Sequence, residues 1–245
     1  MPELPEVETI KRQLSKKIIG KKLEGKLITN VSRRGKMLLI NFSNQESLVF
    51  HLKMTGQLIF NGKKTKHTRQ IFQFEDKSFL TFNDLRKFGW FKKVKDVENL
   101  KEIKQLGPDA LSVNERIFQE RLLKRKQAKI KPLLLDQKFI SGIGNIYADE
   151  ILFKAKINPQ REVANLSPSK ITALYKAIES ILTKAVKERG SSSKDYLDTF
   201  GDKGNYLAFH KVYQKTNQPC PICKTPIQRI EISQRSSHFC PKCQV

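Results

Sequence analysis

The chain has 245 residues, with 47 lysines and arginines against 24 aspartates and glutamates, which gives a formal net charge of +23. This excess is far more than solubility requires and predicts a polyanionic partner, with nucleic acid favoured over an anionic membrane or an acidic protein. The sequence lacks an apolar run of about 18 residues and a signal peptide, so we expect a cytoplasmic protein that does not bind membranes.

The first ten residues combine an early proline with several glutamates. Removal of Met1 would expose Pro2 as a free secondary amine, and because an α-amino group titrates near pH ~8, part of it is nucleophilic at neutral pH. Glu3 follows directly and could move protons for whatever that amine attacks. In the alternative interpretation, Pro2 and Pro5 open a helix whose positive end the glutamates complement. These residues alone leave both interpretations open.

A helix is predicted first, followed by a β-rich region. Apolar residues recur at helical spacing over residues 3–19, and Gly20 ends the pattern. Between residues 27 and 94, short apolar or alternating segments are separated by Asn, Gly, Lys and Asp clusters, which is typical of a β-sandwich or barrel. The predicted strands are Met37–Phe42, Leu48–Leu52, Gln57–Phe60, Ile71–Phe74 and Phe79–Phe82.

Three short stretches in this region carry side chains suited to a nucleic acid. Lys36 precedes a buried-looking strand, so it either points to solvent or faces a bound phosphate. The stretches 51–54 and 84–89 offer side chains that could fill the space left by an extruded nucleotide. Taken alone, Met54 and Phe88 would be assigned to the core.

Helices dominate the second half of the chain. Residues 95–113 are charged and irregular and are predicted to be a linker. A Gly-Ile-Gly-Asn sequence ending at Asn145 could bind a phosphate through free backbone N–H groups at a helix start, or could be an ordinary joint between core helices. The predicted helices cover residues 114–125, 129–138, 145–155 and 167–189.

The last part of the chain contains a loop and a cysteine cluster. Residues 191–209 could close over a bound base or form a surface loop without a role. All four cysteines lie in the last 26 residues, as Cys220, Cys223, Cys240 and Cys243. Two Cys-x-x-Cys pairs can hold one Zn²⁺ with tetrahedral geometry, and a closed Cys₄ shell predicts a structural ion carried by a hairpin of residues 225–232 and 235–239. A redox or unliganded cluster is the alternative.

Three motifs, PELPEVET at residues 2–9, GIGNIY at residues 142–147 and the Cys₄ spacing, together resemble the formamidopyrimidine-DNA glycosylases, bacterial repair enzymes that excise oxidised purines. The resemblance implies an α+β fold, with an N-terminal helix plus β-sandwich domain, then a helical helix-two-turn-helix domain with a C-terminal zinc-bound β-hairpin. The implied domains are a catalytic domain at 1–112, a DNA-binding domain with a lesion-capping loop at 113–215 and a zinc finger at 216–245.

The resemblance also assigns roles to individual residues. Pro2, Glu3 and Lys36 are implied to be catalytic, and Glu6 is implied to lie in the lesion pocket. One structural Zn²⁺ is the implied cofactor, and double-stranded DNA containing oxidised bases or abasic sites is the implied partner. The implied DNA contacts are His51, Asn145 and Arg235 on the backbone, and Met54, Arg86 and Phe88 in the space of the flipped nucleotide.

The implied activity is that of a glycosylase and lyase acting as a monomer in the bacterial cytoplasm, associated with the nucleoid through DNA binding. The Pro2 amine would form a Schiff base with the sugar, followed by β,δ-elimination. The sequence departs from the family in a short segment between Gly20 and Arg33 and in Lys53, where the family usually has glycine. Two alternatives remain: an endonuclease VIII-like enzyme for oxidised pyrimidines, and a noncatalytic zinc-finger binder of nucleic acid.

Overall fold

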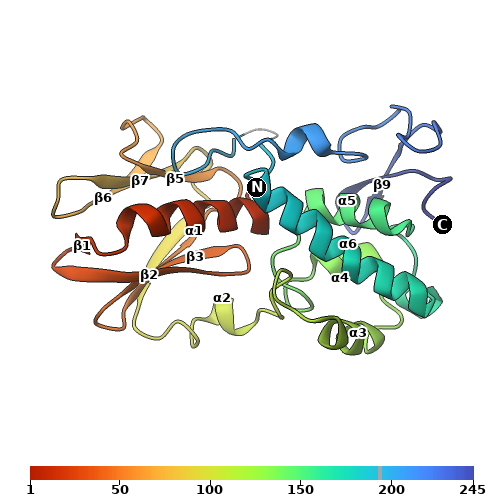
Figure 1. The fold of residues 1–245 in the computed structure, drawn as a ribbon, viewed down its shortest axis with the longest axis horizontal. Coiled ribbons are helices and arrows are strands. Elements are labelled where there is room, and N and C mark those ends of the chain that lie inside the picture. Colours follow the sequence, from red (N-terminus) through yellow and green to blue (C-terminus); the bar gives the residue numbers. More distant parts are fainter. Residues whose placement is uncertain (193–194) are drawn as a thin grey trace. The chain divides into compact units, whose positions relative to one another are not determined.

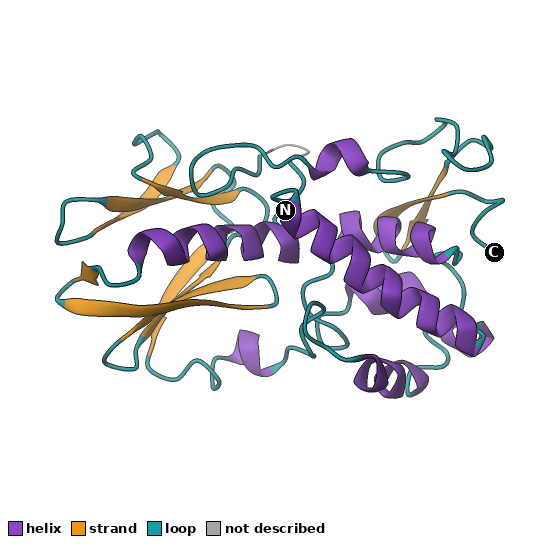
Figure 2. Ribbon diagram, in the orientation of Figure 1, coloured by secondary structure: helices purple, strands orange, loops and turns teal. Residues whose placement is uncertain are grey.

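A computed structural model describes residues 1–192 and 195–245 and divides into two compact units (Figure 1). The first unit contains residues 1–105 together with 185–208, and the second contains 106–184 together with 209–245. The first unit is built mainly from strands and the second mainly from helices (Figure 2). Within the described residues, no helix is both long and apolar enough to span a bilayer.

The first unit begins with α1 (Leu4–Ile18), which confirms the predicted N-terminal helix. A capping box starts it: the Glu6 carboxylate accepts a 2.7 Å hydrogen bond from the backbone N–H of Glu3, whose own carboxylate caps the N–H of Glu6. Pro5 lies in the first turn, where its fixed φ and missing N–H suit a helix start, and lysines lie in the last turn, where they suit the helix dipole. Beyond the helix, Gly20 adopts a φ of +86°, which glycine tolerates without strain.

Two antiparallel sheets complete the first unit, as predicted. Their strand orders are β1-β2-β3-β4-β8 and β5-β7-β6. The strand prediction misses β1, β2 and β8. β1 has only two residues, and β2 and β8 are partly exposed and mix charged with apolar residues. The strands are β1 (Lys22–Leu23), β2 (Lys26–Arg34), β3 (Met37–Phe42), β4 (Ser47–His51), β5 (Gly56–Phe60), β6 (Thr68–Gln73), β7 (Phe79–Asp84) and β8 (Trp90–Val94).

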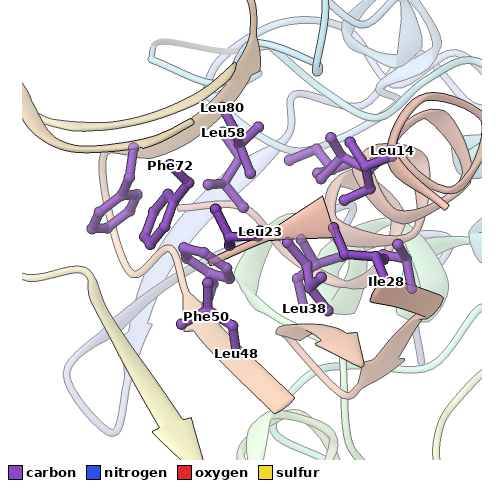
Figure 3. Packing of buried hydrophobic residues seen from close by; sticks show 14 of the residues in the cluster. Leu14, Leu23, Ile28, Leu38, Leu48, Phe50, Leu58, Phe72 and Leu80 are labelled. Atoms are coloured by element: carbon purple, nitrogen blue, oxygen red, sulfur yellow. The ribbon is translucent and has the colours of Figure 1, made fainter. Parts of the chain in front are cut away.

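One hydrophobic core joins α1 to both sheets of the first unit (Figure 3). Leu14 of α1 is fully buried there, as are Phe50 of β4 and Leu80 of β7. The Phe50 ring packs edge-on against Phe72, with ring centroids 5.4 Å apart. Tyr196, from far along the chain, belongs to the same core. Burial of this apolar surface fixes the N-terminal end of α1 against the strands that carry the candidate site.

Helices form most of the second unit, and most of them lie where the periodicity predicts. The predicted helix over 129–138 ends earlier, at Leu135, because the Asp136 carboxylate accepts a hydrogen bond from the Lys138 N–H and stabilises a turn instead. Short elements also include α2 (Lys101–Lys104) in the first unit, and η1 (Val163–Asn165) and η2 (Tyr206–Phe209). The main elements of the second unit are α3 (Glu115–Leu123), α4 (Ile130–Leu135), α5 (Asn145–Ala155), α6 (Pro168–Lys187), β9 (Gln228–Ile232) and β10 (Arg235–Phe239).

Candidate active site and nucleic-acid interface

The N-terminal end of α1 holds two buried carboxylates beside Pro2. Pro2 itself is buried, Glu3 is 2% exposed and Glu6 is 1% exposed. Both oxygens of Glu6 are engaged: one accepts from the Glu3 N–H and the other accepts a 2.7 Å bond from the Ser191 N–H. Glu6 therefore orients Glu3 and ties α1 to the chain around residue 191.

The segment that follows residue 191 is anchored to α1 at a second point. The buried Asp198 carboxylate accepts hydrogen bonds from the Gln13 side chain at 2.8 Å and from Arg189 at 3.0 Å. Phe200, two residues on, is 48% exposed. The expected lesion-capping loop at 191–209 includes residues 193 and 194, which lie outside the described residues. Residues 195–208 belong to the first unit, and the segment ends in η2.

Lys36 lies in the tight turn between β2 and β3 and is 8% exposed. The neighbouring Arg33 fixes this turn, since its guanidinium donates to the Gly35 carbonyl at 2.8 Å and to the Glu8 carboxylate of α1 at 3.0 Å. The pKa of Glu8 is lowered because its bonds to Arg12 and Arg33 outweigh the opposing effect of burial. Glu8 thus remains charged and holds the lysine-bearing turn against α1.

His51 ends β4 and is a neutral hydrogen-bond donor. Its Nδ1 accepts a 3.0 Å bond from the Lys53 N–H, which leaves the proton on Nε2. Burial, with added repulsion from Lys53 and Lys36, lowers its pKa to about 3. A phosphate contact by His51 would therefore be a hydrogen bond to an oxygen, without a formal charge at neutral pH.

Met54, Arg86 and Phe88, which are predicted to fill the space of a flipped nucleotide and are called the wedge residues below, lie on two loops of the first unit. Met54 is 40% exposed and Phe88 is 55% exposed, so the structure does not place them in the core. The Arg86 guanidinium stacks over the Phe88 ring at 4.8 Å from its centroid. Exposed apolar side chains beside an arginine are suited to insertion between bases.

Lys53, next to Met54, has an unusual backbone conformation for a residue with a side chain. Its φ is +49°, in the left-handed region that favours glycine. The loop therefore keeps the backbone that a glycine would adopt and accepts the strain of a side chain there. The Lys53 side chain adds a positive charge directly before Met54 in the sequence.

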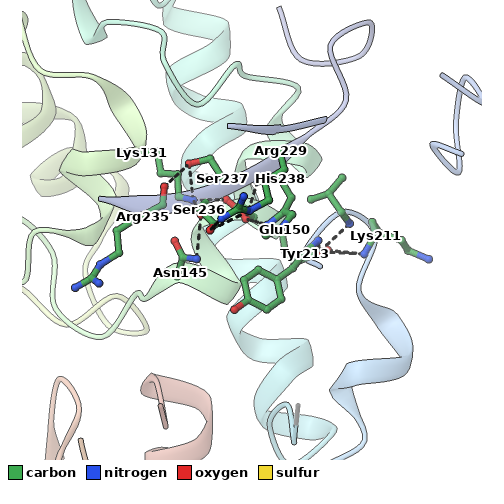
Figure 4. A network of polar contacts seen from close by, with 12 residues as sticks. Lys131, Asn145, Glu150, Lys211, Tyr213, Arg229, Arg235, Ser236, Ser237 and His238 are labelled. Carbon is green, nitrogen blue, oxygen red and sulfur yellow. Dashed lines mark hydrogen bonds and ion pairs between the residues drawn. The ribbon is translucent and has the colours of Figure 1, made fainter. Parts of the chain in front are cut away.

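In the second unit, Asn145 is the first residue of α5, and its side-chain amide donates a 3.0 Å hydrogen bond to the Ser236 carbonyl (Figure 4). The buried Lys131 donates to the same carbonyl at 2.6 Å. Arg235 precedes Ser236, is exposed, and extends away from this network in Figure 4. The start of α5 and the β9–β10 hairpin are thus held together. Asn145 binds the residue that directly follows Arg235.

A buried ion pair supports this arrangement. Lys131 lies 2.6 Å from the Asp149 carboxylate, and Asp149 also accepts from the backbone N–H of His238 at 3.0 Å. The neighbouring Glu150 accepts backbone N–H bonds from residues 211–213, although burial raises its pKa. Two consecutive acidic residues of α5 therefore bind two separate segments of the second unit.

The four cysteines converge beyond β9 and β10, and none forms a disulfide. Their sulfur atoms all lie within 4.8 Å of one another, with 3.9 Å between Cys220 and Cys243 and 3.4 Å between Cys223 and Cys240. Tetrahedral Zn²⁺ with Zn–S bonds of about 2.3 Å places its sulfurs about 3.8 Å apart, so the cluster fits one ion. Four thiolates fill that shell, which makes the ion structural.

Sequence comparison identifies the family to which this chain is related, over its whole length. Residues 19–91 match the formamidopyrimidine-DNA glycosylase N-terminal domain, 106–196 match the H2TH domain of those enzymes, and 217–245 match a zinc finger found in FPG and IleRS. A formamidopyrimidine-DNA glycosylase of Pelotomaculum thermopropionicum is 41% identical, over 100% of this chain and 99% of that protein. The chain belongs to the formamidopyrimidine-DNA glycosylase family.

Solved structures of this family share the fold. The Fpg of Lactococcus lactis, in complex with DNA containing an abasic site, matches with a TM-score of 0.90 and 36% identity over 99% of each chain. A MutM in complex with DNA containing carbocyclic 8-oxo-G matches with a TM-score of 0.89 and 36% identity over 99% of each chain. The predictions of the family, the α+β fold and one structural zinc are confirmed.

The formamidopyrimidine-DNA glycosylase motifs identify the predicted site residues but not several of the residues that position them. The structure brings Glu3 and Glu6 together at the start of α1 and joins Asn145 to the residue after Arg235. Sequence reasoning missed Lys131 and Asp149. A lysine inside the apolar run 130–135 and an aspartate inside a buried helix were the available signals, because a buried charge requires a partner.

Proposed function

We propose that this chain is a bifunctional DNA glycosylase and lyase that excises oxidised purines, such as 8-oxoguanine and formamidopyrimidines, from double-stranded DNA. Family membership supports this proposal, and the observation that carries it at the site is the buried cluster of Pro2, Glu3 and Glu6 at the start of α1. An amine at this end, flanked by an oriented carboxylate, has the groups that imine chemistry at a sugar requires.

In the proposed mechanism, Pro2 is the nucleophile once Met1 has been removed. Its nitrogen attacks C1′ of the damaged nucleotide, the C1′–N bond to the base breaks, and the base leaves with a proton. Glu3 serves the proton transfers, and the opened sugar becomes a Schiff base on Pro2. The cation acidifies the C2′ proton, and loss of this proton expels the 3′ phosphate. The conjugated imine then acidifies the C4′ proton, whose loss expels the 5′ phosphate, and water releases the remaining sugar fragment from Pro2.

The remaining predicted residues would bind and shape the DNA. Lys36, in its fixed turn, would contact a backbone phosphate beside the lesion, and the N–H groups at the start of α5 would bind another through Asn145. His51 and Arg235 would add further phosphate contacts. The zinc ion would hold the hairpin that carries Arg235 and takes no part in the chemistry.

Extrusion of the damaged base costs a few kcal/mol in lost stacking and pairing. Met54, Arg86 and Phe88 would recover part of that cost by filling the vacated space. The described part of the 191–209 loop, tied to Glu6 through Ser191, would border the extruded base. Glu6 would then shape the lesion pocket through the backbone that it holds.

The two alternatives are less well supported. An endonuclease VIII-like enzyme would share the catalytic end, but the wedge residues Met54, Arg86 and Phe88 favour the purine-excising enzymes. A noncatalytic zinc-finger binder would need neither a free amine at Pro2 nor the wedge residues. We further propose that the protein acts as a monomer in the bacterial cytoplasm, associated with the nucleoid, with functional divisions at 1–112, 113–215 and 216–245.

The test is incubation of purified protein with a duplex that contains one 8-oxoguanine opposite cytosine, with and without borohydride. Mass spectrometry first establishes that Met1 has been removed. The matched control is the same protein with one extra residue before Pro2, which converts the proline nitrogen into an amide. We expect strand cleavage and a trapped covalent adduct with the processed protein, and neither with the control.

Each other outcome is informative. Cleavage without an adduct, or an equal adduct with the blocked control, would rule out Pro2 as the nucleophile. Preference for thymine glycol over 8-oxoguanine would favour the endonuclease VIII-like activity. Binding without cleavage of either substrate would favour the noncatalytic binder.

A further inference from the structure

The two loops that carry the wedge residues are joined beneath their exposed tips by a buried carboxylate. Asp84 ends β7, is 2% exposed, and faces Gly56 at the start of β5 in the sheet register. Thr55, next to Met54, is 6% exposed and donates its hydroxyl to the Asp84 carboxylate. This contact spans 29 residues of sequence and connects the Met54 loop to the loop containing Arg86 and Phe88.

The same two side chains also fix the backbone of the second loop. The Arg86 N–H lies 3.0 Å from the Thr55 hydroxyl oxygen and 3.2 Å from the Asp84 carboxylate. The other Asp84 oxygen accepts a 2.6 Å bond from the Gly89 N–H. The backbone N–H groups of Arg86 and Gly89, on either side of Phe88, are thus bound by Thr55 and Asp84, while the Phe88 side chain stays exposed.

The backbone around this junction is closely packed at two glycines. A Cβ placed on Gly56 would lie 2.5 Å from the Leu52 carbonyl oxygen, and one placed on Gly89 would lie 3.0 Å from the Asp84 carboxylate. Lys53 and Lys87 adopt positive φ values, one in each loop. Both loops are therefore closely packed at their bases, around the Thr55–Asp84 contact.

We propose that Thr55 and Asp84 are positioning residues that hold Met54 in register with Arg86 and Phe88, so that the three side chains enter the vacated DNA space as one unit. This inference rests on the proposed wedge role of those three residues. Neither Thr55 nor Asp84 touches the reacting atoms. The carboxylate acts through the hydroxyl and backbone N–H groups that it binds, because side chains held in place before binding lose less entropy when they insert.

The experiment compares Thr55→Val, Thr55→Ser and Asp84→Asn in the full-length zinc-bound protein. Valine keeps the volume and removes the hydroxyl, serine keeps the hydroxyl, and asparagine replaces one acceptor oxygen with a donor. Thr81→Val is the matched control, since Thr81 is fully buried in the same strand β7 and its hydroxyl bonds the Ile59 carbonyl away from the loops. Single-turnover base excision from an 8-oxoguanine duplex is measured beside elimination at a preformed abasic site.

Loss of a buried hydrogen bond predicts that Thr55→Val slows base excision roughly 10-fold and Asp84→Asn somewhat more. Elimination at a preformed abasic site should change less than about 3-fold, because no base has to be unstacked there. Thr55→Ser should restore excision, and Thr81→Val should leave both rates unchanged. A 2-aminopurine base beside the lesion should show reduced extrusion in the Val and Asn variants.

Two results would overturn the inference, and they are distinguishable from failure of the wedge itself. Equal slowing of both reactions by Thr55→Val and by Thr81→Val would indicate a general loss of stability. Normal excision in Thr55→Val and Asp84→Asn, with slow excision in Met54→Ala, would leave the wedge intact and remove the positioning role. Normal excision in Met54→Ala and Phe88→Ala would remove the wedge, and the positioning role with it.

Discussion

Each unit of this protein has a buried carboxylate that orients a part of the candidate site, but the two are compensated in different ways. Glu6, on α1, is bound by two backbone N–H groups, those of Glu3 and Ser191. Asp149, on α5, is bound by the ammonium group of Lys131 and by His238. The first accepts hydrogen bonds from neutral backbone groups, and the second belongs to a buried ion pair.

The difference determines what each part tolerates. Backbone N–H groups remain in place whatever side chain faces them, so a change at Glu6 leaves the N–H groups of Glu3 and Ser191 without this acceptor. A buried ion pair loses its compensation when either member is removed, and the remaining charge then lies in a medium that solvates it poorly. We therefore expect the second unit to be the more sensitive of the two to substitution.

Removal of zinc should produce the largest contrast between the units. A structural zinc site contributes about 10 kcal/mol or more to folding of an isolated zinc finger, so Cys240→Ser should unfold the β9–β10 hairpin and abolish DNA binding. Hydrogen exchange should rise at residues 228–239 and stay slow at residues 4–18. Zinc content is measured on the same samples, and an unchanged hairpin in the zinc-free variant would contradict the prediction.

Substitution of Lys131 by methionine tests the ion pair. Asp149 would remain buried without its cation, which predicts a loss of about 3–5 kcal/mol in the free energy of unfolding. The control is the double variant Lys131→Met/Asp149→Asn, which removes both charges and should recover much of that loss. Urea denaturation measures both, and equal stability of the single and double variants would argue against the pair.

Substitution of Glu6 by glutamine tests the hydrogen bonds from backbone N–H groups to Glu6. It should lower the free energy of unfolding less than Lys131→Met does. The amide of glutamine cannot accept from both Glu3 and Ser191, so one N–H loses its partner and the free energy of unfolding should fall by about 1–3 kcal/mol. Glu75→Gln, at an exposed position, serves as the control and should stay within about 0.5 kcal/mol of the parent. If Glu6→Gln lowered the free energy of unfolding as much as Lys131→Met does, the expected difference between the two units would be wrong.

The smallest effect is a pH dependence from one histidine in each unit. Burial lowers the pKa of His51 to about 3 and that of His210 to about 4. Below pH ~6.5 the unfolded chain binds a proton that the folded protein does not, so stability falls as the pH decreases from ~6.5 towards those values and is flat above it.

Urea denaturation between pH 4.5 and 7.5 measures this dependence, with His51→Gln and His210→Gln as the test variants. Each variant should have a flatter profile below pH ~6.5 than the parent protein. The His51 result is the cleaner one, because the second unit also loses zinc as its thiolates become protonated. Profiles parallel to that of the parent would contradict the burial of a neutral imidazole.

Local patterns in the sequence were sufficient to predict much of the fold. The helical period over residues 3–19 and the spacing of apolar residues in five strands depend only on neighbours along the chain. The strand β2 escaped prediction because charged residues interrupt its alternation, and its pairing with β3 buries only part of it. Pairing partners supply information that a single segment lacks.

The candidate site likewise combines features that local sequence predicts with contacts that only the tertiary structure shows. The sequence by itself indicated the glutamates at the start of the first helix, the glycines before Asn145 and the Cys₄ cluster, since each follows from spacing over a few residues or from the coordination chemistry of one ion. Only the tertiary structure decided that Glu6 binds Ser191, 185 residues away, and that Thr55 meets Asp84. Those contacts form because strands and loops distant in sequence are packed together, and burial then requires each polar group to find a partner among whatever lies nearby.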